Sequence, residues 1–202
     1  MKKQISRQLR VYRYVFYRET LVDPREHIWS FVGAFVGIFI IAFTQSLHLP
    51  VLENVFLIGS FGASSVLVYG SIQSPLAQPR NLVGGHAVSA LVGVTVAYVL
   101  PDIIWLTAPL AVASSIVFMQ MTRTLHPPGG ATALIAVAGN TKIASLGYWY
   151  VLSPVLSGTL ILLLTALIFN NITSKRHYPV KHSRLRRSRR QHLKARRRSG
   201  RG

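Results

Sequence analysis

The sequence predicts an all-α, polytopic membrane helical bundle. Three features support this: long uncharged stretches, strongly basic ends, and a helix-breaking motif between two apolar runs. The uncharged stretches cover residues 27–52, 54–79, 81–101, 103–122, 124–141 and 143–174. A membrane-spanning helix needs about 20 mostly apolar residues. A helix of a soluble core would instead show charge on its outer face every turn or two.

The two ends carry most of the positive charge. Of the 23 Lys and Arg residues, seven precede residue 27 and thirteen follow residue 174. Segments that stay in the cytoplasm are enriched in Lys and Arg. We therefore expect both termini on the cytoplasmic side of the cell membrane, which is the inner membrane in a bacterium. The first 27 residues are too polar for a cleavable signal peptide, and the absence of cysteine excludes disulfides.

This polarity divides the chain into three parts. Residues 1–27 predict a cytoplasmic, amphipathic basic segment that lies on anionic lipid headgroups. Residues 28–172 form the predicted transmembrane domain. Residues 173–202 are mostly Arg, Lys, Ser and His, so we expect a disordered cytoplasmic tail that also binds acidic lipid. No folded nucleic-acid-binding motif accompanies these charges, so nucleic acid is not an expected partner.

Five long apolar helices are expected in the transmembrane domain. They cover residues 28–47, 51–70, 82–100, 103–121 and 148–170. Gly33 and Gly37 in the first helix form a GxxxG pattern, which lets helices pack closely. Tyr148 to Tyr150 begin the last helix as an interfacial aromatic belt. Five crossings would place the basic tail outside the cell, against the charge rule, so one crossing is missing from this count.

The missing element is residues 123–140, which contain the motif LHPPGGATAL at residues 125–134. Pro127 and Pro128 donate no backbone hydrogen bond and keep the residue before them out of helical geometry. The glycines that follow allow close backbone approach, and residues 131–138 predict a short helix. Non-helical backbone in a bilayer survives only where protein or a wet cavity covers it. This motif is therefore the candidate site.

An internal repeat accounts for the missing crossing. The string GASSVL at residues 62–67 resembles GATALI at residues 130–135, 68 positions later, and the same offset carries 82–100 onto 150–168. The chain is then two three-element repeats, each a helix, a broken or re-entrant segment and a helix. Four or six crossings result, and either number keeps both ends on one side. Inverted repeats with broken helices recur in transporters, with the binding site at the repeat interface.

The chemistry of such a site favours an anion. A helix that begins within the membrane points its first free N–H groups and the positive end of its dipole into the gap. We expect such helix N-termini at residues 129–132 and 62–65. Glu53 and Asp102 fall at segment edges, so oxygen ligands for a cation or metal ion are not expected. The candidate site residues, which supply amides, hydroxyls, imidazoles or a guanidinium, are Gly62, Ser64, Ser65, Arg80, Asn81, His86, His126, Pro127, Pro128, Gly129, Gly130, Ala131 and Thr132.

Some of these residues also have a purely structural interpretation. Arg80 and Arg123 would anchor their helices at the headgroups, and His126 would cap the broken helix. His86, beside two glycines, would be a packed core histidine. If the two histidines lie close together they would shuttle protons, because histidine titrates near neutral pH.

Two motifs resemble those of the HPP family of integral membrane proteins. They are QPRNLVGGH at residues 78–86 and TLHPPGGATA at residues 124–133, which contains the triplet that names the family. The similarity covers roughly residues 25–172, and the Arg-rich tail departs from it. The resemblance implies a region with a few transmembrane helices. Plant and cyanobacterial members are linked to nitrite transport, so it also implies a carrier of nitrite or a related small anion.

The sequence therefore predicts a membrane transporter for a small inorganic anion, nitrite first, bound at helix N-termini near the bilayer midplane. An anion channel and a homo-oligomer stay open, as does a non-transporting scaffold that acts through the basic tails. An intramembrane enzyme would use Ser64 or Ser65 as nucleophile and His86 or His126 as base. It lacks an acid to orient the histidine, so we expect no enzyme, no cofactor and no metal. If free amides hold the anion, Gly130→Leu should abolish uptake.

Overall fold

The computed structural model describes residues 24–48, 51–139, 141–174 and 176–180, and within them it contains helices and no strand. The elements are α2 Pro24–Ser46, α3 Val51–Ser65, η1 Val66–Gly70, η2 Pro75–Ala77, α4 Pro79–Val99, α5 Ile104–Met121, α6 Gly129–Ala138, α7 Thr141–Leu146, η3 Val151–Leu156 and α8 Ser157–Phe169. In this part of the chain, four helices are long and apolar enough to cross a membrane, namely Glu26–Ser46, Pro79–Val99, Ile104–Met121 and Val151–Phe169. The predicted helical membrane bundle is confirmed. Most of the amphipathic segment expected in residues 1–27 and of the disordered tail expected in residues 173–202, namely residues 1–23 and 181–202, lies outside the described residues.

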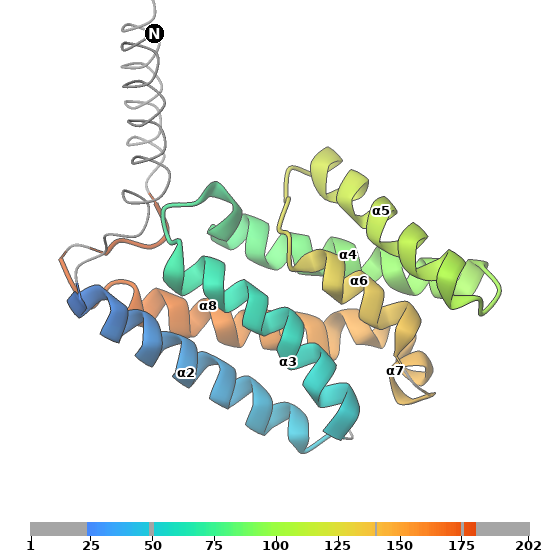
Figure 1. The fold of residues 1–202 in the computed structure, drawn as a ribbon, viewed down its shortest axis with the longest axis horizontal. Coiled ribbons are helices and arrows are strands. Elements are labelled where there is room, and N and C mark those ends of the chain that lie inside the picture. Colours follow the sequence, from blue (N-terminus) through green and yellow to red (C-terminus); the bar gives the residue numbers. More distant parts are fainter. Residues whose placement is uncertain (1–23, 49–50, 140, 175, 181–202) are drawn as a thin grey trace, which may run out of the picture.

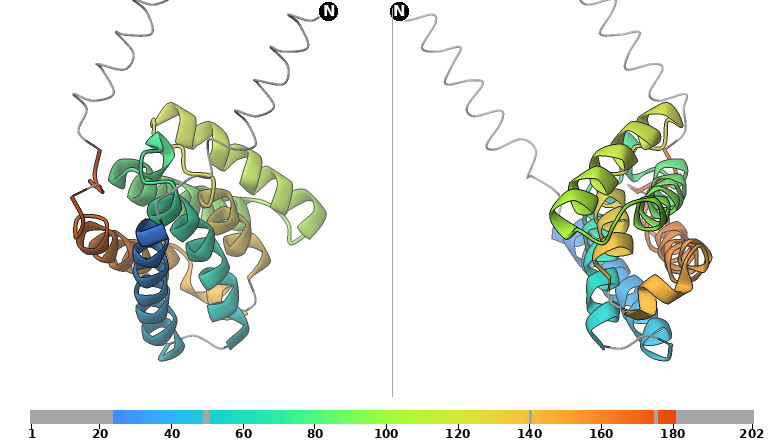
Figure 2. Two further views of the ribbon diagram at one scale, coloured as in Figure 1. Left: turned by 60° about the vertical axis from the view of Figure 1, so that its left-hand side comes forward. Right: turned by 90° about the vertical axis from the view of Figure 1, so that its right-hand side faces the viewer.

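The helices interlock as two three-element units (Figures 1 and 2). Helix α5 packs on α4 and α6 at one edge of the bundle, and α2 packs on α3 and α8 at the other. The first helix of each predicted repeat thus contacts the second helix of its own repeat and the third helix of the other. Residues near the two described ends also meet, since the Arg176 Nε atom lies 3.4 Å from Glu26 Oε2. Both ends of the described chain therefore lie on the same side of the bundle, as an even number of crossings requires.

The predicted break at Gly62 is wrong, because α3 runs directly into η1 and residues 51–70 form one helical rod. The segment contains no proline. Ser65 fits within it by donating a hydrogen bond to the carbonyl of Phe61 over 3.0 Å, and Ser64 Oγ lies 3.2 Å from the carbonyl oxygen of Ser60. Irregularity comes only at η1, a π-helix. Side chains occupy two of its carbonyls: Asn170 donates to that of Val68, and Ser30 and Arg176 donate to that of Tyr69.

The last helix, predicted to be continuous over 148–170, is interrupted instead. Ser153 in η3 has non-helical dihedrals (φ −140°, ψ 121°), and α8 begins only at Ser157. Pro154 explains the interruption, because proline lacks the N–H that an α-helix would use. Its carbonyl accepts hydrogen bonds from Gln45 Nε2 at 3.3 Å and Ser157 Oγ at 3.2 Å. The expected turn at residues 140–142 is also replaced, because α7 begins at Thr141.

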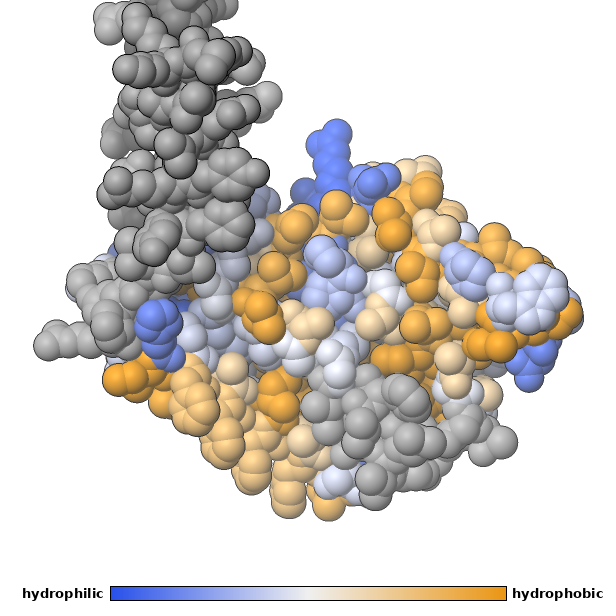
Figure 3. All heavy atoms as spheres, viewed as in Figure 1, coloured by the Kyte–Doolittle hydropathy of each residue, from blue (hydrophilic) through white to orange (hydrophobic). Residues whose placement is uncertain are grey.

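Helix α2 shows most clearly which surface faces lipid. Phe31, Phe35, Phe39 and Phe43 stack at successive turns along its outer face, with 58–70% of each residue exposed. Figure 3 shows apolar colour along this helix and hydrophilic residues gathered elsewhere, near the ends of the bundle. The glycines predicted to allow close packing occupy the inner face, where a Cβ on Gly33 would lie 2.8 Å from the Tyr69 ring. An apolar exterior of this kind is typical of a surface in contact with lipid.

Candidate functional site

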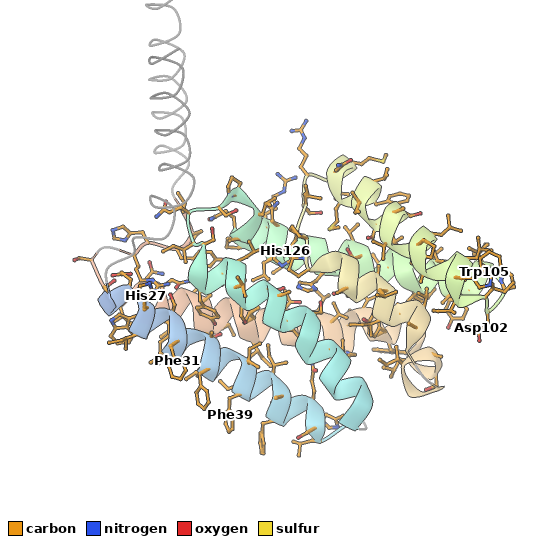
Figure 4. All side chains as sticks on the ribbon, in the orientation of Figure 1. His27, Phe31, Phe39, Asp102, Trp105 and His126 are labelled. Carbon is orange, nitrogen blue, oxygen red and sulfur yellow. The ribbon has the colours of Figure 1, made fainter. Side chains whose placement is uncertain are left out.

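Buried polar side chains gather where α3, α4 and the start of α6 meet. Five of them, each at most 2% exposed, are Ser60, Ser64, His86, His126 and Thr132. We refer to these five residues as the histidine network. Figure 4 shows His126 in the interior, whereas Asp102 and His27 lie at opposite edges of the bundle. The structure thus brings together the GASSVL segment, the second half of QPRNLVGGH and the HPPGG motif.

His126 reaches the interior because the chain between α5 and α6 is extended and runs against α4 (Figure 1). Gly85 makes this close approach feasible: a Cβ there would collide with the Cβ of His126 and lie 2.8 Å from the Thr124 carbonyl oxygen. Asn81 Nδ2 donates to the carbonyl of Leu125 at 2.7 Å, and Arg80 Nη2 donates to that of Thr122 at 2.8 Å. Arg80 and Asn81 therefore hold the backbone of the extended segment.

The hydroxyl of Ser64, in α3, lies between the imidazole rings of His86 and His126. Ser64 Oγ is 2.8 Å from His86 Nε2 and 2.9 Å from His126 Nε2, and the two rings are 5.0 Å apart between centroids. On its other side, His86 Nδ1 lies 2.7 Å from Thr132 Oγ1, which is 2.9 Å from Ser60 Oγ. His126 Nδ1 lies 2.9 Å from the carbonyl oxygen of Leu76. The network is therefore one continuous chain of hydrogen bonds.

The fixed acceptor at one end assigns every proton in this chain. A carbonyl oxygen only accepts, so His126 Nδ1 carries a hydrogen and its Nε2 is bare in the neutral ring. Ser64 then donates to His126 Nε2 and accepts from His86 Nε2–H. Thr132 donates to His86 Nδ1 and accepts from Ser60. Every group is satisfied with both imidazoles neutral, and a proton added at one histidine can reach the other through the shared hydroxyl of Ser64.

The repeat offset reappears within the network. Ser64 and Thr132 are 68 residues apart, and they bond the two nitrogens of the same ring, His86. Ser60 and Pro128 are separated by the same number, and Ser60 Oγ lies 3.1 Å from the Pro128 carbonyl oxygen. Equivalent positions of the two repeats therefore approach His86 from both sides.

The prediction that these helices begin with free amides is wrong. Within the start of α6, the amide of Gly129 donates to the carbonyl of His126 at 2.8 Å, and that of Gly130 donates to Pro127 at 3.0 Å. The amides of Ala131 and Thr132 both donate to Pro128, at 3.1 and 3.4 Å. The carbonyls before the helix thus fold back over its first turn. Residues 62–65 lie within α3 and offer no helix N-terminus either.

Other predicted residues lie outside the network, and two contributors were missed. Ser65 donates to its own helix and Pro127 is exposed. Ser60 was missed, although it stands one helical turn before Ser64 and so on the same face. Tyr150, whose hydroxyl donates to the Thr132 carbonyl at 3.0 Å, was taken for an interfacial residue but is fully buried.

A charged cluster lies outside the network, at the end of the bundle where α2 begins. Arg176, which is 3% exposed, pairs with Glu26 and donates to the carbonyl of Tyr69 at 2.6 Å. Burial lowers the pKa of Arg176, and the nearby carboxylate of Glu26 partly offsets this. Tyr178 donates to the carbonyl of Ala77 at 2.7 Å, and burial raises its pKa. The packed chain therefore continues to Val180, past the boundary expected at residue 172.

Comparisons with known proteins agree with this architecture. The HPP transmembrane region matches residues 19–179. One transmembrane protein of Dictyostelium discoideum is 48% identical over 161 residues, which cover 78% of this chain and 51% of the relative. A second from the same organism is 45% identical over 166 residues, covering 81% and 58%. The chain spans little more than half the length of these relatives, and no solved structure matches it. With the family matched over most of its length, this chain belongs to the HPP transmembrane family of multi-pass membrane proteins.

Proposed function

We propose that this protein transports a small inorganic anion, nitrite first, across the membrane together with a proton taken up by the histidine network. The observation that supports this most directly is the position of Ser64 Oγ, which lies within hydrogen-bond distance of two buried imidazoles. The family resemblance suggests nitrite, because members in plants and cyanobacteria are linked to its transport. The same proposal places both termini on the cytoplasmic side of the membrane.

Electrostatics favours joint movement of anion and proton. The network is fully hydrogen-bonded when neutral, and no carboxylate contacts it among the described residues. A protonated imidazole buried there would lack a counter-ion, and burying an unpaired charge costs several kcal/mol. An incoming anion removes this penalty by pairing with the imidazolium. The hydroxyls of Ser60, Ser64 and Thr132 would then donate to the anion in place of the helix amides, which are already occupied.

Uptake of ¹⁵N-nitrite into proteoliposomes tests the proposal. We expect an inward proton gradient to accelerate uptake, and His86→Gln and His126→Gln each to abolish that acceleration. His27→Gln, an exposed histidine at the edge of the bundle, is the matched control and should behave like the wild type. Accumulation above the external concentration would identify a carrier, whereas a channel only equilibrates the anion. Wild-type uptake by both network variants would contradict the proposal.

The same contacts favour a second candidate, an intramembrane hydrolase. Ser64 lies within hydrogen-bond reach of a histidine base, as a nucleophile would. Two features weigh against it: the Nδ1 atom of His126 faces a backbone carbonyl, and the α6 amides that would stabilise an oxyanion are occupied. A fluorophosphonate probe distinguishes the two candidates. We expect it to leave Ser64 unlabelled, and labelling that disappears in Ser64→Ala would favour the hydrolase.

A scaffold that acts through the basic tail makes the opposite prediction for a truncated chain. The truncation must end at Val180, because Arg176 and Tyr178 are part of the packed bundle. We expect the shortened protein to transport nitrite at the wild-type rate. Loss of the biological function with transport retained would favour the scaffold.

A further inference from the structure

A cavity of about 280 Å³ lies between the C-terminal end of α2 and the interruption before α8. It stands at the opposite end of α2 from Glu26 and the charged cluster. Its lining residues are Thr44, Gln45, His48, Leu146, Ser153, Pro154, Ser157 and Ile161. His48 and Ser153 are exposed, so the cavity reaches the surface of the protein.

Three polar residues of this cavity, Thr44, Gln45 and Ser157, have oxygens that are free to accept hydrogen bonds. Gln45 is only 6% exposed, and its Nε2 donates to the Pro154 carbonyl while its Oε1 has no partner. Thr44 and Ser157 donate their hydroxyl hydrogens to carbonyls of nearby backbone, which leaves their oxygens as acceptors. A buried amide oxygen without a donor is energetically unfavourable. The cavity therefore suits a small solute that donates hydrogen bonds.

The aromatic ring of Phe61 lies between Gln45, in the wall of this cavity, and the histidine network. A Cβ on Gly158 would lie 2.6 Å from Phe61 Cζ and 3.0 Å from Gln45 Nε2, so the Phe61 ring reaches the wall beside Gln45. On its other side the same ring lies 5.3 Å from the His86 ring between centroids. Phe61 is 1% exposed and belongs to α3, one turn from Ser64. Rotation of this side chain would join the cavity to the network.

We propose that the cavity is a water-filled access vestibule of the histidine network and that the Phe61 side chain is the gate between them. Water in the cavity donates to the hydroxyl oxygens of Thr44 and Ser157 and carries protons to His86. The titratable groups along the route are His48 at the mouth, His86 and His126 beyond the gate, and Tyr150 against Thr132. The vestibule depends on the proposed function only for the identity of the anion that accompanies the proton.

Cysteine accessibility tests the vestibule directly, because the chain has no cysteine of its own. A charged, membrane-impermeant methanethiosulfonate reagent should modify Ser157→Cys in proteoliposomes and leave Ser64→Cys unmodified. Adding Phe61→Ala should expose Ser64→Cys, with modification about tenfold faster or more. Leu162→Ala, which opens space at a buried leucine of α8, is the control for general loosening and should leave Ser64→Cys protected.

Size-exclusion profiles establish that each variant is folded, and Phe61→Leu offers a milder opening if the alanine variant aggregates. Protection of Ser157→Cys would overturn the vestibule. Continued protection of Ser64→Cys in a folded Phe61 variant would overturn the gate, as would equal exposure by Leu162→Ala. If the protein shows the expected labelling pattern but transports no nitrite, the result would support the vestibule and reject only nitrite as the transported anion.

Discussion

The second elements of the two repeats take different paths to the same imidazole. Residues 51–70 form an uninterrupted helical rod, whereas residues 123–138 are an extended stretch followed by the short helix α6. Both provide a hydroxyl to His86, from Ser64 and Thr132 respectively. Only the broken element also provides a ring, because its extended backbone lets His126 turn inward before the helix begins. The break therefore positions the His126 side chain. The backbone amides at the start of α6 remain hydrogen-bonded to the carbonyls just before the helix.

The two elements also differ in how tightly their surroundings hold them. Around the intact rod, a Cβ on Gly59, Gly62 or Gly70 would meet no atom within 4 Å. Along the broken element the backbone lies directly on α4, at Gly84 and Gly85, with no room for a methyl group. We expect substitutions of the same kind to be tolerated in the rod and to be costly against the broken element.

The largest difference in stability between the two elements should come from a matched pair of glycine substitutions. Gly85→Ala forces a methyl group against the Cβ of His126 and the Thr124 backbone, and overpacking of this kind costs about 1–3 kcal/mol. The methyl group added by Gly62→Ala would have no atom within 4 Å, so this substitution should stabilise the helix slightly, by up to about 1 kcal/mol. Thermal unfolding in detergent, followed by intrinsic fluorescence, measures both. Equal melting temperatures for the two variants would contradict the tight contact between α4 and the broken element.

Removing either ring should have the next largest effect. His86→Leu deprives one hydroxyl on each element, Ser64 and Thr132, of a partner, and we expect the two losses together to cost about 1–3 kcal/mol. His126→Leu affects Ser64 and the Leu76 carbonyl, and it should destabilise less because Leu76 is only half-buried. The double variant should lose less unfolding free energy than the two single variants together, since both rings share Ser64. Full additivity in chemical unfolding would show that the rings act independently.

The equivalent hydroxyls should differ in their effect on transport. Ser64→Ala disconnects the two rings and should remove the stimulation of nitrite uptake by a proton gradient. Thr132→Val leaves the contact between Ser64 and both rings intact, so a reduced stimulation should remain. Thr132→Ser restores the hydroxyl and should restore uptake. Indistinguishable uptake curves for Ser64→Ala and Thr132→Val would show that the proton does not pass through Ser64.

The contrast between the two elements also shows how far sequence reasoning reached. Long uncharged stretches identified α2, α4 and α5 to within a few residues, because membrane helices must be apolar along their whole length. The double proline identified the break before α6. The GASSVL segment resembles its counterpart in composition but has no proline, and small residues are compatible with an intact helix as well as a broken one. Composition alone therefore could not predict that the repeats diverge here.

The sequence predicted which segments meet in the interior but not the hydrogen bonds between them. The offset of 68 residues correctly paired the segments of Ser64 and Thr132, and both histidines were among the candidates. The carbonyls from His126 to Pro128 fold back and accept hydrogen bonds from the first amides of α6. No residue pattern in the sequence reveals this backbone arrangement. The position of Phe61 beside Gly158 likewise depends on contacts between distant helices.

The smallest expected effect is at Gly130, the position equivalent to Gly62. Its amide already donates to the Pro127 carbonyl, and a Cβ there would come no closer than 3.7 Å to any neighbour, Val112 Cγ1. Gly130→Ala should therefore change stability by less than about 0.5 kcal/mol and leave nitrite uptake unchanged. Gly129→Ala is the sensitive neighbour, because its Cβ would lie 2.6 Å from Ser89 Oγ, and it should lower the melting temperature. A folded Gly130→Ala protein without uptake would mean that the anion touches the backbone at this position, and the amides of the broken element would again be the binding site.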